Sequence, residues 1–121
     1  MTEPIDSEDT PSAYLTRDQV AALKAASPGV RLYALDVPDD GVAVVFRAPT
    51  EVEYRPLING KLDRAADRST VLAQLAIKLV VAPGTDELAT LFKLYPALAS
   101  RIAGQAMAIA AGEGAATAKK L

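Results

Sequence analysis

The spacing of hydrophobic and polar residues along this chain has two periods, one typical of helices and one typical of strands. The first segment with a regular pattern has the helical period. A helix is predicted to start at Thr16, because Thr16 and Gln19 have the spacing of a capping box. Val20 and Leu23 then recur on one face, as in an amphipathic helix. The Ser-Pro-Gly run at residues 27–29 is predicted to end it.

Two strands are predicted next, because residues 30–37 and 42–48 are rich in β-branched and aromatic side chains. Pro38-Asp39-Asp40-Gly41 lies between them, and its Asp-Gly pair favours a tight hairpin turn. Two strands alone are only marginally stable in water. We therefore expect helices to cover one face of the hairpin, or other subunits to extend its sheet.

The rest of the chain returns to the helical period. A helix is predicted from about residue 51, since Thr50 and Glu53 have capping-box spacing, and Pro56 should break it by about residue 58. Three further helices are predicted over about 67–82, from a cap at Thr85 to residue 95, and over about 96–111 with a stop at Gly112. The apolar stripe of the first of these helices contains Leu72, Leu75, Ala76, Leu79 and Val80. That of the second contains Leu88, Leu91, Phe92 and Tyr95, and that of the third contains Leu98, Ile102, Ala106 and Ile109.

This order of elements predicts a small α+β domain that is mostly α: an N-terminal helix and a β-hairpin, followed by three to four packed helices. Residues 1–14 are predicted to be a disordered acidic tail, because they carry carboxylates and no positive side chain. Residues 15–112 are predicted to form the single α+β domain, and residues 113–121 a flexible C-terminal tail. A length of 121 residues suits one domain.

The composition excludes much catalytic chemistry. The chain has no cysteine and no histidine, which removes thiol nucleophiles, thiolate metal sites and the commonest general acid–base side chain. We therefore expect no enzymatic activity and no cofactor. A formal net charge of −2 lacks the basic excess of nucleic-acid binders, and no apolar run is long enough to span a membrane. The expected location is the cytoplasm.

Acidic side chains offer the remaining candidates for a metal site. Asp63 and Asp67 lie within one and a half helical turns, but two carboxylates alone rarely hold Mg²⁺ or Ca²⁺. A solvated face, on which Arg64 pairs with Asp67, explains them better. Asp39 and Asp40 fit the chemistry of a turn. We therefore predict no metal site.

The last predicted helix is rich in alanine, the residue that accounts for 24 positions of the chain. Small side chains let helices approach closely, so two interpretations stay open. The helix is either a thin core helix of this domain, or it packs against another subunit or a partner helix. The candidate interface residues are Leu98, Ile102, Met107 and Ile109, and the flexible side chain of Met107 suits an adaptable contact.

Three short motifs carry a resemblance to a known family. The stretch Val44-Val45-Phe46-Arg47-Ala48-Pro49-Thr50, followed by Glu53-Tyr54, is similar to the centre of the small tail assembly chaperones of long-tailed phages and prophages. That family's helical half is resembled by Val80-Val81-x-Pro83 and Leu94-Tyr95-Pro96-Ala97-Leu98. The resemblance covers about residues 42–111, and the order and spacing of the motifs carry it.

The resemblance implies a non-enzymatic function in protein binding. Members of the family hold the tape-measure protein in the host cytoplasm before the tail-tube protein polymerises around it, and they often self-associate. The implied partners are therefore the tape-measure protein, the tail-tube protein as a second candidate, and further copies of this chain. Residues 56–60 depart from the continuous helix expected there, and the resemblance transfers no catalytic or binding residue. A structural virion component, such as a tail-completion or head–tail connector protein, is the alternative.

Overall fold

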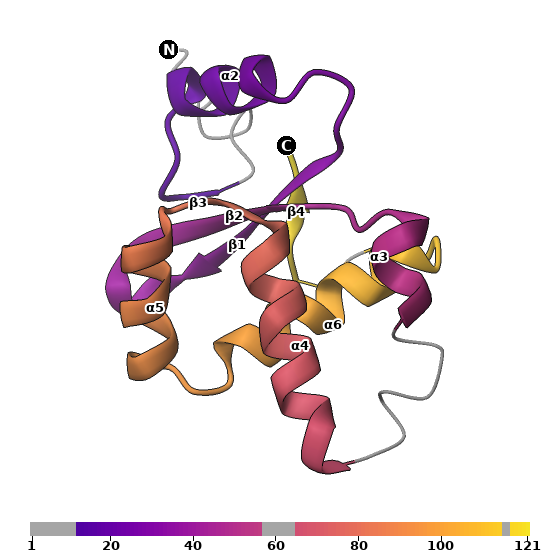
Figure 1. Ribbon diagram of the computed structural model, residues 1–121. Coiled ribbons are helices and arrows are strands. Elements are labelled where there is room, and N and C mark those ends of the chain that lie inside the picture. Colours follow the sequence, from indigo (N-terminus) through magenta and orange to yellow (C-terminus); the bar gives the residue numbers. More distant parts are fainter. Residues whose placement is uncertain (1–11, 57–64, 115–116) are drawn as a thin grey trace.

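The computed structural model describes residues 12–56, 65–114 and 117–121, which form an antiparallel sheet with helices on both faces (Figure 1). The four strands lie in the order β3-β2-β1-β4. The predicted α+β class is therefore confirmed. In chain order the elements are α2 (Arg17–Ala26), β1 (Leu32–Val37), the 3₁₀ helix η1 (Pro38–Asp40), β2 (Val42–Arg47), α3 (Glu51–Pro56), α4 (Ala65–Leu79), β3 (Val80–Ala82), α5 (Thr85–Leu94), α6 (Leu98–Ala110) and β4 (Lys119–Lys120).

The predicted hairpin forms the centre of the sheet. Its strands β1 and β2 pair in antiparallel register, from Leu32 opposite Arg47 to Val37 opposite Val42. The connecting turn η1 ends at Gly41, whose φ of 67° lies in the left-handed region. Glycine reaches this conformation without the steric cost of a Cβ, which explains why it closes the turn.

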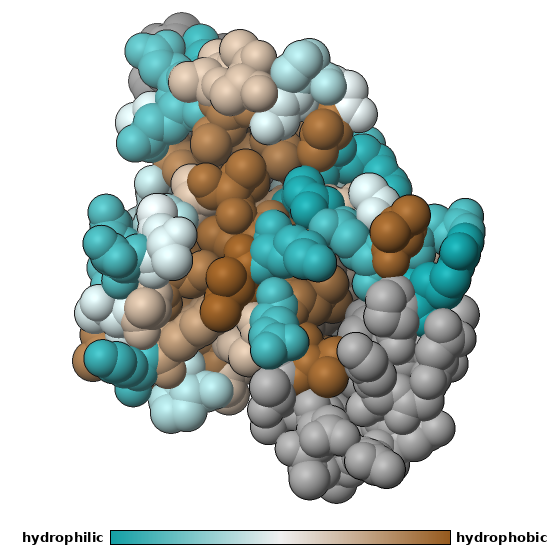
Figure 2. Space-filling view, in the orientation of Figure 1, coloured by the Kyte–Doolittle hydropathy of each residue, from teal (hydrophilic) through white to brown (hydrophobic). Residues whose placement is uncertain are grey.

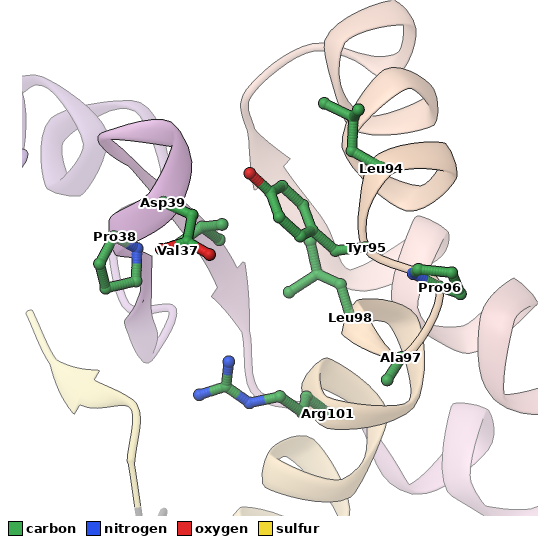
Figure 3. A pocket seen from close by; sticks show the side chains of 9 residues that line it. All are labelled: Val37, Pro38, Asp39, Leu94, Tyr95, Pro96, Ala97, Leu98 and Arg101. Carbon is green, nitrogen blue, oxygen red and sulfur yellow. The ribbon is translucent and has the colours of Figure 1, made fainter.

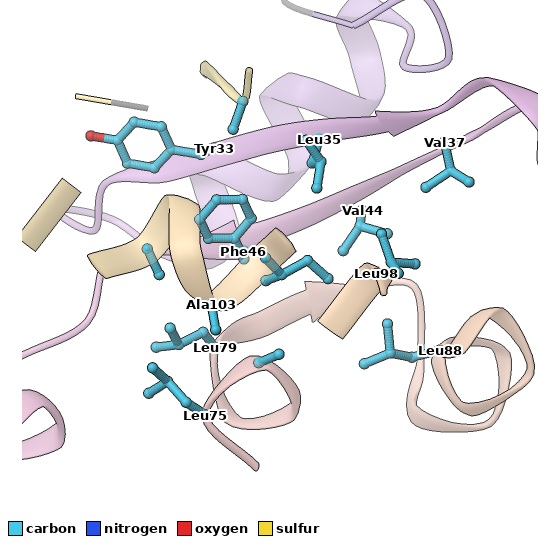
Figure 4. Packing of buried hydrophobic residues seen from close by; sticks show 14 of the residues in the cluster. Tyr33, Leu35, Val37, Val44, Phe46, Leu75, Leu79, Leu88, Leu98 and Ala103 are labelled. Carbon is cyan, nitrogen blue, oxygen red and sulfur yellow. The ribbon is translucent and has the colours of Figure 1, made fainter. Parts of the chain in front are cut away.

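The inner face of the sheet, which α4, α5 and α6 cover, carries the main core (Figures 1 and 4). Successive strand residues point to opposite faces, and the inner set contains the largest side chains. Phe46 is fully buried, and its ring stacks on that of Tyr33 with 5.9 Å between the ring centroids. The helices complete this core with Leu75, Leu79, Leu88, Leu91, Leu98, Ile102 and Ile109.

The outer face of the sheet carries a much smaller cluster of buried residues: Leu32, Ala34 and Val45. Helix α2 lies over this face (Figure 1), yet none of its residues is buried. The partly buried Leu15 and Leu23 pack against the cluster. The outer face is therefore thinly covered.

A side-chain hydrogen bond holds the segment before α2 against the sheet. The Ser12 hydroxyl donates a hydrogen bond of 2.5 Å to Asp36 Oδ1 on β1, and Ser12 is buried. The boundary predicted at residue 14 for the N-terminal tail is therefore too late. Residues 1–11 lie outside the described residues.

Two short strands that the sequence pattern did not predict complete the sheet. β3 was expected as the last turn of a helix, but Val80 pairs with Phe46, and Ala82 with Val45. β4 lies in the C-terminal segment 113–121 that was predicted to be flexible, and there the prediction is wrong. The Gln105 side chain of α6 accepts hydrogen bonds from the backbone at residues 117 and 118, and Leu121 N–H donates to the Leu32 carbonyl. These tertiary contacts, which no local pattern encodes, hold residues 117–121 against the sheet and α6.

Most of the helix ends described next lie where the capping residues in the sequence predicted them. The capping boxes at Thr16 and Thr50 are both formed. Gly112 has a φ of 81° and ends α6, where two backbone hydrogen bonds of 3.0 Å close a Schellman motif. The prediction for Thr85 is wrong by one residue, because Gly84 takes the extended N-cap position and Thr85 becomes the first residue of α5.

Candidate functional site

The structure places most of the predicted interface residues in the core of this chain. Leu98 and Ile109 are each 3% exposed, and Ile102 is fully buried. Helix α6 packs against α4, so the neighbour that the sequence left open belongs to the same chain. Met107 is partly buried against the same core. Of the two interpretations that the sequence left open, the structure therefore supports a core helix, and Leu98, Ile102 and Ile109 are not exposed interface residues.

The motif at the end of β2 forms an ion pair that joins β2 to α3. The guanidinium of Arg47 donates two hydrogen bonds, of 2.7 and 2.5 Å, to the two carboxylate oxygens of Glu53. The Thr50 N–H donates to the same carboxylate at 2.9 Å. Hydrogen bonding from Arg47, together with that from Thr50, lowers the pKa of Glu53 to about 2. This motif therefore has a structural role at the strand–helix junction.

A pocket opens where the hairpin turn meets the junction between α5 and α6 (Figure 3). Its volume is about 400 Å³, within the range of ligand pockets. Residues 37–39 form one wall, and residues 94–98 with Arg101 form the other. Figure 3 shows the side chains of Tyr95 and Arg101 extending from the helical wall toward the hairpin. The pocket thus brings together two segments that lie far apart in the sequence.

The lining of the pocket is mostly apolar, with one charged group on each wall. Asp39 lies on the hairpin wall and Arg101 on the helical wall, and both are exposed. The Tyr95 hydroxyl donates a hydrogen bond of 3.3 Å to Asp40 Oδ1 and so links the two walls. Partial burial and the negative charges of Asp40 and Asp39 raise the pKa of Tyr95. The hydroxyl therefore stays protonated, and able to donate, at neutral pH.

A smaller hollow of about 190 Å³ adjoins the same turn. Asp40 and Val42 contribute its hairpin side, and Glu87, Thr90 and Leu91 of α5 contribute its helical side. The hairpin turn therefore contributes residues to two neighbouring hollows.

Hydrophobic side chains also gather on another surface. Figure 2 shows them running from beneath α2, across β3, to the region between α4 and α5. Ile77 of α4 is 50% exposed and Val81 of β3 is 42% exposed. β3 lies at an edge of the sheet, where exposed apolar residues favour contact with another chain. This edge surface is a second candidate for protein binding.

The described residues contain no cluster of side chains that could hold a metal ion. No group of three or more His, Cys, Asp or Glu side chains within residues 12–56, 65–114 and 117–121 is arranged to hold a metal ion. Asp63 of the predicted acidic pair lies outside these residues. In the same part of the chain, every helix is too short or too polar to cross a membrane.

Sequence reasoning found one wall of the pocket without recognising the pocket itself. The Leu94-to-Leu98 motif was singled out for its resemblance, whereas Arg101 and the turn were not connected with it. Comparisons with protein-family models, with curated proteins and with solved structures found no match to this chain. The pocket, the edge surface and the sequence motifs are therefore the features that point to a function.

Proposed function

We propose that this chain is a phage tail assembly chaperone, which binds the tape-measure protein in the host cytoplasm before the tail tube polymerises around it. The observation that carries the proposal is the setting of the Leu94-to-Leu98 motif. This motif, part of the resemblance to the chaperone family, lines an open apolar pocket. Leu94, at the edge of the lining, is 58% exposed. A motif in that setting is suited to contacting another protein.

The physical requirements of the proposed client agree with such a surface. A long helical protein exposes apolar stripes until the tube encloses it, and exposed stripes promote aggregation. A binding protein with a shallow apolar pocket and an apolar edge surface can cover such stripes with modest affinity at each contact. Modest affinity allows the chaperone to leave as the tube grows. Self-association through the edge strand β3 would place several such pockets along one client.

A structural virion component is the second candidate function. The observation that favours it is the edge strand β3, whose apolar Val81 is 42% exposed. Neighbouring subunits in a ring can extend each other's sheets at such an edge. A connector or tail-completion protein stays in the finished particle, whereas an assembly chaperone leaves it.

Co-expression with the tail proteins of the source genome tests both candidates. We expect a tagged chain to recover the tape-measure protein, and mass spectrometry to find the chain absent from purified virions. Presence in virions at a ring-like copy number would instead support the structural component. Recovery of no tail protein, with absence from virions, would overturn both.

A matched pair of variants tests whether the pocket is the surface that binds the tape-measure protein. Leu94→Ser should reduce recovery of the tape-measure protein, because it removes an exposed apolar side chain from the lining. Val52→Ser is the control, since Val52 is 75% exposed on α3 and does not line the pocket. Equal recovery with both variants would show that the pocket is not the client-binding surface. Thermal unfolding checks that both variants fold.

A further inference from the structure

We propose that the pocket between the hairpin turn and the α5–α6 junction binds a peptide segment that inserts one bulky apolar side chain and places a carboxylate on Arg101. The chemistry of this ligand follows from the pocket. The inference rests on the proposed function only for the source of the segment, which would then be the client protein.

The apolar part of the pocket matches a side chain rather than a flat contact. A volume of about 400 Å³ accommodates a bulky aliphatic or aromatic group together with part of its backbone. Pro38 and Pro96 line opposite walls, and proline fixes its own φ. The hydrogen bond from Tyr95 to Asp40 joins these walls. The pocket is therefore largely formed before a ligand arrives, which reduces the ordering cost of binding.

The charges in the pocket give the ligand an orientation. Within the part of the chain that the structure describes, the Arg101 guanidinium makes no ion pair or hydrogen bond, and it extends across the pocket (Figure 3). Guanidinium matches a carboxylate with two parallel donors. Asp39, on the opposite wall, repels the same carboxylate. The acidic group of the ligand should therefore lie on the α6 side.

The residues around the pocket favour a peptide over other negatively charged ligands. Leu94 continues the apolar surface at the edge of the lining, so a ligand longer than one side chain gains further contact. Asp39 and Asp40 lie on the hairpin side, and among the described residues that line the pocket Arg101 is the one basic side chain. This balance disfavours a nucleic-acid backbone, whose repeated phosphates require several positive side chains.

Nuclear magnetic resonance with the full chain tests the ligand chemistry directly. The probes are 3-phenylpropanoate, which has an aromatic group and a carboxylate, and its uncharged amide. At millimolar concentration we expect saturable amide shifts at the non-proline residues among 37–39, 94–98 and 101. The carboxylate should bind about tenfold more tightly than the amide, the effect of one charge-assisted hydrogen bond. Absence of these shifts, or equal affinities of the two probes, would overturn the inference.

Arg101→Gln should remove the preference for the carboxylate over the amide, because glutamine carries no positive charge. Arg101 is exposed, so the variant should keep the fold, which its spectrum checks. Arg31→Gln is the control, because Arg31 is also exposed and lies outside the pocket lining. A preference for the carboxylate that survives in Arg101→Gln would contradict the assigned role of Arg101.

The same variants separate this inference from the proposed function. If the carboxylate probe binds as expected but the unaltered chain does not recover the tape-measure protein, the proposed function fails and the pocket chemistry stands. If the unaltered chain and Arg101→Gln recover the client equally and the probe does not bind, the pocket inference fails and the function stands. Loss of recovery in Arg101→Gln but not in Arg31→Gln would support both.

Discussion

The two faces of the sheet are covered by helices in very different ways. On the inner face, α4, α5 and α6 contribute side chains to one large core around Phe46 and Leu79, both fully buried. On the outer face, α2 covers three buried residues and buries none of its own. Since burial of apolar area is the main favourable contribution to folding, the inner face should determine the stability of the domain.

On the outer face, a few polar contacts add to the small apolar cluster. A capping box starts α2 at Thr16, and the Ser12 hydroxyl holds the preceding segment to Asp36. Each such contact contributes little net free energy compared with a buried aromatic side chain. The inner-face helices should therefore form the more stable part of the molecule, and α2 on the outer face should unfold locally at a lower free-energy cost.

The largest expected effect comes from the inner core. Phe46→Ala should lower the free energy of unfolding by about 3–5 kcal/mol, because it leaves a cavity where the ring stacks on Tyr33. Leu23→Ala, on the outer face, should cost about 1 kcal/mol, since Leu23 is only partly buried. Urea unfolding measures both values. Equal costs would mean that the two faces contribute alike.

The ion pair at the end of β2 should show a pH dependence that the apolar core lacks. The folded-state pKa of Glu53, about 2, lies below its ordinary value of 4.5. The unfolded chain therefore binds more protons in this interval, and the stabilisation, complete above about pH 4.5, is lost as the pH falls toward 2. Glu53→Gln should cost about 1–2 kcal/mol near neutral pH, and the difference from the unaltered chain should shrink in acid.

Urea unfolding at neutral and acidic pH measures this difference. Glu51→Gln is the control, because the Glu51 side chain is 79% exposed in its pair with Arg55. An exposed pair of this kind contributes about 0–1 kcal/mol. A Glu53→Gln effect that stayed constant from neutral pH to below pH 4 would contradict the assigned role of the carboxylate.

A smaller and local effect is expected at the start of α2. Thr16→Ala removes the capping box and should destabilise this helix by about 1 kcal/mol. Hydrogen exchange should become faster at the amides of α2 while those of α4 and α6 keep their protection. Thr90→Ala in α5 is the control, since the Thr90 hydroxyl bonds only within its own helix. Faster exchange throughout the molecule would show that the two faces open together.

The smallest expected effect is at the edge surface. Ile77→Ser should change the free energy of unfolding by no more than about 0.5 kcal/mol, because Ile77 is 50% exposed. Leu79→Ser, two residues on and fully buried, should be strongly destabilising. Thermal unfolding of the two variants measures the difference. A large loss for Ile77→Ser would place that side chain in the core instead.

The features that sequence reasoning predicted correctly are those that short-range chemistry determines. The Asp-Gly turn and the two capping boxes involve residues within a few positions of each other, so their spacing alone identifies them. The strands β3 and β4 are different. Each is two or three residues long and exists because of its pairing with β2 or β1, so no periodicity distinguishes it.

In the candidate site, too, the sequence predicted the local pattern but not the tertiary contacts. An apolar stripe through Leu98, Ile102 and Ile109 was visible in the sequence, but a stripe does not tell whether its neighbour is α4 of the same chain or another subunit. The pocket depends on the meeting of Tyr95 with Asp40, which are 55 positions apart. Only the tertiary fold brings this pair together.

The hairpin turn has a consequence for how the protein can diversify. It contributes to two hollows at once, and its residues lie outside both apolar clusters. Turns tolerate substitution and insertion far better than packed strands do. Changes of sequence at Pro38, Asp39 and Asp40 can therefore alter the size and charge of both hollows while the core remains untouched.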